Sequence, residues 1–294
     1  MHVMIVGCNG ALGGQCARRF EALGELVTGV DLPELDITDE DAVRARVEGV
    51  GPELIVNCAA FTDVDGCEQE REAARRVNAD GPRFLARAAR AAGARFIHVS
   101  TDYVFDGERA PPRAYAEDDC PSPQSWYGKT KLAGERAVME EMPAAAVART
   151  AWLYDARGSN FIKAILKQIL GRKASTLRVV NDQHGSPTWA RRLAEQMAVM
   201  AGAETHGIYH ATAQGCCTWY ELAQRVVAWS GADCTVEPCD SSAYPRPATR
   251  PGNSILDNAR LRQAGLEVMV DWREDLDDFL ATCGGALRAE AMQT

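Results

Sequence analysis

The sequence lacks the features of several protein classes. No apolar run approaches the ~18 residues that would indicate a membrane span, and residues 1–6 carry no charged segment typical of a signal peptide. The ten cysteines are scattered and form no C-x-x-C motif, so neither a zinc ribbon nor a thioredoxin-type site is indicated. We therefore expect a reduced, cytoplasmic protein without a membrane partner.

Positive charge is also scarce. The 294 residues include 32 Lys and Arg against 41 Asp and Glu, which gives a net charge of −9, and no run rich in Lys or Arg occurs. A nucleic-acid-binding protein usually shows a basic face, so we expect no nucleic-acid partner. An anionic small molecule is still compatible with this balance, because a few local cations and backbone N–H groups can hold a phosphate.

The first half alternates short apolar runs with helical patterns rich in Ala and Arg. Alternation of this kind predicts βαβ units and an α/β fold with a doubly wound parallel (Rossmann) sheet. We expect a dinucleotide-binding domain in residues 1–150, with a return to the sheet near 174–202, and a smaller substrate-binding lobe formed by 151–173 and 203–294. The predicted strands are Val3–Val6, Leu26–Val30, Leu54–Asn57, Arg95–Ser100, Ala145–Arg149 and Leu177–Val180, and the predicted helices are Gly14–Leu23, Glu40–Glu48, Arg71–Ala92, Tyr127–Glu141, Asn160–Leu170, Thr188–Ala201 and Trp219–Trp229.

A glycine-rich turn follows the first predicted strand. Its sequence is Gly7-Cys8-Asn9-Gly10-Ala11-Leu12-Gly13. Glycine allows a sharp turn and a close backbone approach to a pyrophosphate, and the helix that follows offers N–H donors to the phosphates. A tight strand-to-helix turn without a ligand would also explain the glycines, but the position inside a βαβ pattern favours a dinucleotide site.

Carboxylates and small residues follow the next two strands. Asp31 lies about twenty residues after the turn, where a carboxylate can accept hydrogen bonds from the adenosine ribose. The alternative for Asp31 is a solvated loop acid. A second carboxylate near the adenine is predicted at Asp36-Ile37, and the small residues of Asn57-Cys58-Ala59-Ala60 would let a cofactor lie against a strand end. Because Asp31 would repel a 2′-phosphate, we expect NADH to be used at least as well as NADPH.

Tyr127 and Lys131 lie four residues apart in a predicted helix and therefore share one face. An ammonium near a phenol favours the phenolate, so we expect Lys131 to lower the pKa of Tyr127. Tyr127 could then protonate a carbonyl oxygen as a hydride arrives, and Lys131 could hold the nicotinamide ribose. Ser100-Thr101, at the end of an upstream strand, could polarise the same carbonyl. The alternatives are an exposed helix pair and capping hydroxyls.

Taken together, these motifs resemble the extended short-chain dehydrogenases/reductases and, within them, the dTDP-4-dehydrorhamnose reductases. Stretches similar to that branch run nearly end to end: Val56–Asp65, Ser100–Gly107, Tyr127–Glu135, Arg149–Tyr154, Val180–Thr188, Gly207–Ala211, Thr218–Ala223 and Arg250–Asp257. The branch often carries Gln inside the glycine motif, whereas Gln15 follows it here.

The resemblance implies a function and a set of site residues. The chain would reduce dTDP-4-dehydro-L-rhamnose to dTDP-L-rhamnose, a precursor of cell-surface polysaccharide, with NADH or NADPH. The catalytic residues would be Thr101, Tyr127 and Lys131. The cofactor would contact Gly7, Asn9, Gly10, Ala11, Leu12, Gly13, Asp31, Asp36, Ile37, Ala59, Ala60, Thr62, Asn78, Tyr127 and Lys131. The substrate would contact Thr101, Asp102, Tyr103, Trp152, Asn160, Gln183 and Arg250. For Arg250, which would clamp a diphosphate, the alternative is a solvated side chain.

Tyr103 distinguishes reduction from dehydration. Related nucleotide-sugar dehydratases place an adjacent Asp and Glu after the strand-end Thr, and here the order is Thr101-Asp102-Tyr103. An unperturbed Tyr has a pKa of ~10 against ~4.3 for Glu, so it is a poor base for a carbon-bound proton. We therefore expect net consumption of reduced cofactor.

Other interpretations remain open from the residues alone. Some proteins with this fold are NAD(P)-binding regulatory subunits, for example of methionine adenosyltransferase. His206 and His210 could suggest a metal site, but the residues between them are typical of a strand, which would hold the two imidazoles too far apart. The sequence indicates no metal site, although a magnesium ion is suspected in parts of the family and is compatible with this sequence. A homodimer is also compatible with the sequence, but no residue pattern indicates one.

Overall fold

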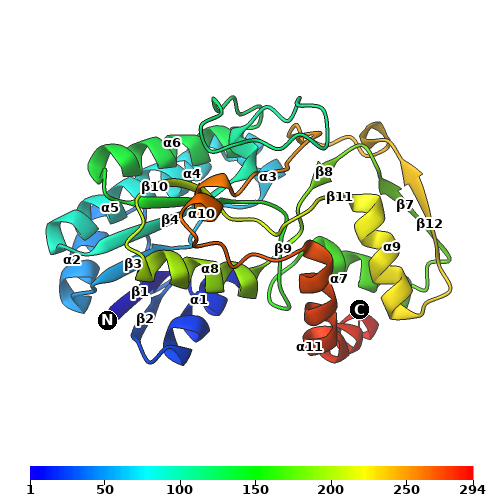
Figure 1. The fold of residues 1–294 in the computed structure, drawn as a ribbon, viewed down its shortest axis with the longest axis horizontal. Coiled ribbons are helices and arrows are strands. Elements are labelled where there is room, and N and C mark those ends of the chain that lie inside the picture. Colours follow the sequence, from blue (N-terminus) through cyan, green and yellow to red (C-terminus); the bar gives the residue numbers. More distant parts are fainter. Residues whose placement is uncertain (294) are drawn as a thin grey trace.

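The computed structural model describes residues 1–293. The larger part of the molecule is built around a six-stranded parallel sheet (Figure 1). The strand order is β10-β5-β4-β3-β1-β2, and every pair in it is parallel. The strands are β1 (His2–Val6), β2 (Leu26–Val30), β3 (Leu54–Asn57), β4 (Arg95–Thr101), β5 (Ala146–Thr150) and β10 (Gly207–His210). All residues of β3 and β5 are buried, as expected for strands covered on both faces. The predicted α/β fold is confirmed.

Helices cover both faces of this sheet. Val3 and Ile5 of β1 pack with α1 and α8 on one face, whereas Met4 and Val6 pack with α2, α5 and α6 on the other. Successive strand residues point to opposite faces, so one short apolar strand contributes to both cores. The helices of this part are α1 (Ala11–Ala22), α2 (Glu40–Val50), α3 (Val64–Gln69), α4 (Arg71–Arg75), η1 (Arg76–Asp80), α5 (Gly81–Ala92), η2 (Asp102–Val104), α6 (Trp126–Glu141) and α8 (Ala190–Gly202).

The return to the sheet differs in part from the prediction. Helix α8 does return and packs on α1, but the returning strand is β10, beside β5. The strand expected near 177–180 exists as β7 (Thr176–Val180) and pairs with β12 (Thr235–Cys239) instead. Only Val179 of β7 is buried, whereas strands inside the central sheet are buried along most of their length.

Apart from α10, which packs against β10 of the central sheet, the remaining elements form a lobe with a core of its own at the other end of the molecule (Figure 1). Its core contains Ile162, Leu166, Trp189, Val226 and Phe279. Besides β7 and β12, the elements after β5 and outside the central sheet are β6 (Leu153–Tyr154), α7 (Phe161–Leu166), η3 (Lys167–Gly171), β8 (His184–Gly185), β9 (Thr188–Trp189), β11 (Cys217–Thr218), α9 (Trp219–Ser230), η4 (Ser241–Ala243), α10 (Ala259–Gln263) and α11 (Trp272–Met292). The division into two domains at the stated boundaries stays a prediction.

Two further findings concern the chain as a whole. None of the helices in residues 1–293 is both long enough and apolar enough to span a membrane. All ten cysteines are free thiols.

Candidate active site

The glycine-rich turn lies where the chain reverses direction across the sheet. β1 has β2 on one side and β3 on the other, and in doubly wound sheets ligands bind beyond the carboxyl ends of strands at such a switch point. A Cβ on Gly7, whose φ is +80°, would lie 2.7 Å from Ala59 N, and one on Gly13 would lie 2.1 Å from Gly7 O. Side chains are therefore excluded from this cradle. Gly10, the N-cap of α1, provides no capping side chain, so Ala11 and Leu12 begin a helix whose first N–H groups remain available to a phosphate.

The residues expected around the adenosine follow β2, and Asp31 among them contacts the turn. Asp31 follows β2, and its two carboxylate oxygens accept hydrogen bonds from Asn9 N at 2.9 Å and Leu32 N at 2.8 Å. Asp36 accepts hydrogen bonds from the backbone and hydroxyl of Thr38, which lower the pKa of its carboxyl group. Ile37 is buried against Gly81, where a Cβ would lie 2.7 Å from Ile37 Cδ1.

The segment after β3 is tied to the predicted catalytic helix. Asn57 Oδ1 accepts from Ala59 N at 3.0 Å. The fully buried Asn78 accepts from Phe61 N at 2.8 Å and donates to Thr130 Oγ1 at 3.1 Å. Asn78 therefore fixes the spacing between this segment and α6. Ala60 is half-buried, and Thr62 is exposed.

Helix α6 brings Tyr127 and Lys131 to the end of β4. A Cβ on Gly128 would lie 2.2 Å from Tyr103 O, so this glycine lets the helix closely approach Thr101-Asp102-Tyr103, the strand-end motif. The ring of Tyr103 meets that of Tyr127 edge-on at 5.5 Å. Lys131 Nζ donates to Val99 O at 2.7 Å. An ammonium has three N–H donors, and Val99 O is the one acceptor that Lys131 has among the described residues.

Thr101 and Asp102 complete this group. The Thr101 hydroxyl donates to Asp102 Oδ1 at 2.9 Å, while Asp102 Oδ2 is buried without a hydrogen-bond partner among residues 1–293. Burial raises the pKa of Asp102 to about 6. A buried acceptor without a partner is costly, and a ligand hydroxyl could supply the missing hydrogen bond.

Burial governs the ionisation of the two helix residues. It lowers the pKa of Lys131 to about 8, although Glu135 acts in the opposite direction. Burial and the charge of Asp102 raise the pKa of Tyr127, against a smaller lowering by a hydrogen bond with Thr101. The expectation of a lowered pKa for Tyr127 is therefore wrong, because loss of hydration and the charge of Asp102 raise it. Tyr127 is protonated at neutral pH.

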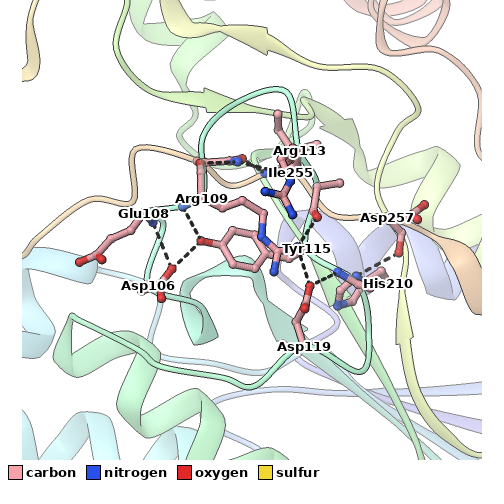
Figure 2. Close-up of polar contacts among 12 residues, drawn as sticks. Asp106, Glu108, Arg109, Arg113, Tyr115, Asp119, His210, Ile255 and Asp257 are labelled. Carbon is pink, nitrogen blue, oxygen red and sulfur yellow. Dashed lines mark hydrogen bonds and ion pairs between the residues drawn. The ribbon is translucent and has the colours of Figure 1, made fainter.

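A long loop supports the strand-end motif from the side of the C-terminal segment (Figure 2). Phe105 stacks on Tyr115 at 4.4 Å, and Tyr115 OH donates to Asp106 Oδ1 at 2.5 Å. Arg109 Nη1 donates to Asp119 Oδ2 at 2.7 Å, and Tyr115 N donates to Ile255 O at 2.8 Å. The loop from 106 to 119 is thereby fixed by its own side chains and by the chain near residue 255.

The expected substrate residues of the lobe form an aromatic group. Trp152 has a φ of +46°, which is strained for a bulky residue and often marks a functional site. Its ring stacks on Trp219 at 3.4 Å, and Trp219 Nε1 donates to Gln183 Oε1 at 3.2 Å. Asn160, by contrast, caps α7 by accepting from Lys163 N and donates to Asp155 O, so both of its amide atoms are used locally.

Arg250 connects the lobe to the segment after β3. Its Nη2 donates to Asp65 Oδ2 at 2.8 Å and its Nη1 donates to Ala248 O at 3.0 Å. The positive charge of Arg250 also lowers the pKa of Tyr103, although burial and Asp102 raise that pKa overall. The guanidinium therefore lies within electrostatic range of the strand-end motif.

Comparison with known proteins agrees with this geometry. The sequence model of one family, described as the RmlD substrate binding domain, matches residues 1–284. The dTDP-4-dehydrorhamnose reductase of Streptomyces griseus is 44% identical over 293 residues, which cover 97% of this chain and 95% of that protein. The chain belongs to the dTDP-4-dehydrorhamnose reductase family.

Solved structures of the family share the fold. The dTDP-4-dehydrorhamnose reductase of Clostridium acetobutylicum superposes with a TM-score of 0.93 at 38% identity, covering 97% of this chain and 100% of that one. The Bacillus anthracis enzyme, solved in complex with NADP, gives 0.91 at 35% identity, covering 96% and 99%.

The structure also places at the candidate site residues that the sequence motifs did not single out. Trp219 contacts Trp152 and Gln183, and Asp65 contacts Arg250. Trp219 and Asp65 each lie in a stretch similar to the family, which is the one signal the sequence contained for them. No cluster of three or more His, Cys, Asp or Glu in residues 1–293 could hold a metal ion, and His210 is buried in β10, where its Nδ1 lies 3.1 Å from Asp257 O.

Proposed function

We propose that the chain reduces the 4-keto group of dTDP-4-dehydro-L-rhamnose, forms dTDP-L-rhamnose for cell-surface polysaccharide, and acts as a cytoplasmic enzyme. The observation that carries this proposal is the convergence of Thr101, Tyr127 and Lys131 at the carboxyl edge of a sheet whose switch point holds a side-chain-free cradle. The reduced state of all ten cysteines fits the cytoplasm.

The cradle fits a dinucleotide. Gly7 and Gly13 let the turn pack tightly against Ala59 and against the start of α1, which keeps the turn free of side chains, and Asp31 lies beside the turn to receive ribose hydroxyls. When bound, NADH or NADPH supplies the hydride. Lys131, with N–H groups beyond the one given to Val99 O, would hold the nicotinamide ribose.

Tyr127 is the proton donor in this proposal. A keto oxygen that receives a hydride on its carbon needs a proton, and the phenol of Tyr127 holds one at neutral pH because burial raises its pKa. The Thr101 hydroxyl would polarise the same carbonyl. Tyr103 stays protonated for the same reason as Tyr127 and cannot serve as a carbon base, which favours reduction over dehydration.

The sugar nucleotide would lie between the strand-end motif and the lobe. Trp152 and Gln183 offer an aromatic face and an amide, and Arg250 offers a guanidinium for the diphosphate. Arg250 would exchange Asp65 for the substrate, because both side chains are about a quarter exposed (23% and 25%) and an ion pair of this kind is easily broken.

The test follows absorbance of the reduced cofactor. The protein is incubated with the keto-sugar nucleotide and, separately, with dTDP-glucose. We expect one cofactor oxidised per product with the keto sugar and none with dTDP-glucose. Loss of water from dTDP-glucose without net cofactor consumption would indicate a dehydratase. Cofactor binding without turnover of either sugar would favour a regulatory subunit.

A further inference from the structure

Arg157 lies against the first turns of α1, although it belongs to the segment that connects β6 to α7. A Cβ on Gly14 would lie 2.6 Å from Arg157 Nη1 and 3.3 Å from Arg157 Cζ. Gly14 has no positive φ that would require glycine. The guanidinium therefore occupies the room that this glycine leaves, one residue beyond the cradle formed by Gly7 and Gly13.

The segment that carries Arg157 is anchored on α1. Asp155 is 2% exposed, and its Oδ1 accepts hydrogen bonds from Gln15 Nε2 at 2.7 Å and Trp189 Nε1 at 3.2 Å. Asn160 Nδ2 donates to Asp155 O at 2.6 Å. The backbone on both sides of Arg157 is thus fixed relative to the glycine-rich turn, and the arginine is placed there by buried contacts.

The charge of Arg157 is not neutralised by the protein. The side chain is exposed, and no carboxylate in residues 1–293 forms an ion pair with it. It lies near the N-terminal end of α1, where the helix dipole is positive and a cation is unfavourable. Its field reaches the turn, because Arg157 lowers the pKa of Cys8 against a larger raising by burial and Asp31. A cation held at a positive helix end, without an acidic partner, is stabilised when an anion joins both.

We propose that Arg157 is a cofactor-binding residue that contacts a phosphate of the dinucleotide held by the glycine-rich turn. The phosphate is either the diphosphate or the 2′-phosphate of NADPH, since both would bring negative charge to this turn. The proposal rests on the cofactor assignment made above and adds to it a contact from outside the sheet domain. Because Arg157 lies between Trp152 and α7 in the chain, cofactor binding would also tighten this segment of the lobe against α1.

The test measures dissociation constants for NADH and for NADPH with wild type and Arg157→Ala, by quenching of tryptophan fluorescence and by calorimetry, without any sugar present. We expect the Kd to rise about ten-fold or more, as for loss of one charge-assisted hydrogen bond. An equal rise with both cofactors assigns Arg157 to the diphosphate. A rise confined to NADPH assigns it to the 2′-phosphate. Unchanged Kd values for both would overturn the proposal.

Matched variants separate this contact from a general loss of charge. Arg172→Ala removes another exposed arginine, which has no ion pair among the described residues, and should leave both Kd values unchanged. Arg157→Lys keeps a cation and should recover part of the affinity. Gly14→Ala should displace the guanidinium while leaving its charge, and so raise the Kd by less than Arg157→Ala. If wild type itself binds neither cofactor, the proposed function fails, whereas normal wild-type binding with an unaffected Arg157→Ala variant refutes only this inference.

Discussion

The two sides of the candidate site are held in different ways. At the sheet edge, Thr101, Tyr127 and Lys131 are 5%, 9% and 2% exposed, and close backbone approaches at glycines set their positions. On the lobe side, Arg250 is 23% exposed and is held by another side chain, Asp65. A buried group loses its place only if the fold changes, whereas a half-exposed pair can change partners. We therefore expect the sheet edge to determine turnover and the lobe to determine substrate affinity.

The largest effect is expected at Tyr127. Tyr127→Phe removes one hydroxyl and little volume, and general acid catalysis typically contributes ~10²–10⁴-fold in rate. We expect kcat to fall by that factor while the Kd for the cofactor is retained, measured by steady-state kinetics and fluorescence titration. Tyr220→Phe, which removes a hydroxyl from an exposed pair with Gln224, should be neutral. Near-normal turnover of Tyr127→Phe would exclude the assigned role.

The ion pair behind the sheet edge should dominate stability. Glu135 and Arg149 are 2% and 1% exposed and form two hydrogen bonds of 2.8 and 2.7 Å. Glu135→Gln leaves a buried guanidinium without its partner, so the free energy of unfolding should fall by about 3–5 kcal/mol in urea denaturation.

Glu72→Gln is the matched control for this pair. Glu72 and Arg75 are 71% and 45% exposed, so the free energy of unfolding should fall by less than about 1 kcal/mol in Glu72→Gln. Equal losses for the two variants would show that burial does not distinguish these pairs.

Arg250 tests the lobe side of the comparison. If its guanidinium binds the substrate diphosphate, Arg250→Ala should raise KM by roughly 10–100-fold, the equivalent of a charge-assisted hydrogen bond of about 1.5–3 kcal/mol, with a smaller change in kcat. Asp65→Asn keeps Arg250 and should change KM much less. A fall in kcat at constant KM for Arg250→Ala would place this residue with the sheet edge.

The smallest expected effect is a decline of kcat/KM at alkaline pH. Burial lowers the pKa of Lys131 to about 8, and the charged form of a lysine is the one present below its pKa. Activity that requires this charge is therefore lost as the pH rises through about 8, and kcat/KM should decline about ten-fold per pH unit above it. In Lys131→Arg the charge persists, so the remaining activity should show no such decline; a decline retained in that variant would assign it to another group.

Much of the sheet domain could be predicted because its determinants are local. The glycine-rich turn, the position of β2 and the shared face of Tyr127 and Lys131 follow from spacing and apolar runs. The start of α1 was predicted at Gly14 but lies at Ala11, because glycines in the first turn obscure the helical pattern. The sequence predicts one helix over Arg71–Ala92, but the structure contains a π-helical turn at Arg76–Asp80. This turn packs closely on α6, because a Cβ on Gly134 would lie 2.1 Å from Asn78 O.

The rest depends on contacts between distant parts of the chain. Nothing near Thr176 indicates that β7 pairs with β12 rather than with β5. The raised pKa of Tyr127 depends on burial beneath neighbouring segments, which helix spacing alone does not provide. Arg157 reaches Gly14 across more than a hundred residues of sequence, whereas the sequence predicts Gly14 only as the first residue of a helix.

The stacked indoles of Trp152 and Trp219 give the lobe an intrinsic optical reporter. Two parallel rings 3.4 Å apart couple their electronic transitions, and such a pair contributes a strong signal to the near-ultraviolet circular dichroism spectrum. If the nucleotide sugar binds beside Trp152 as proposed, its arrival should change that coupling. On that proposal, substrate arrival would be timed in the unlabelled protein by stopped-flow dichroism, separately from the loss of cofactor absorbance that records hydride transfer.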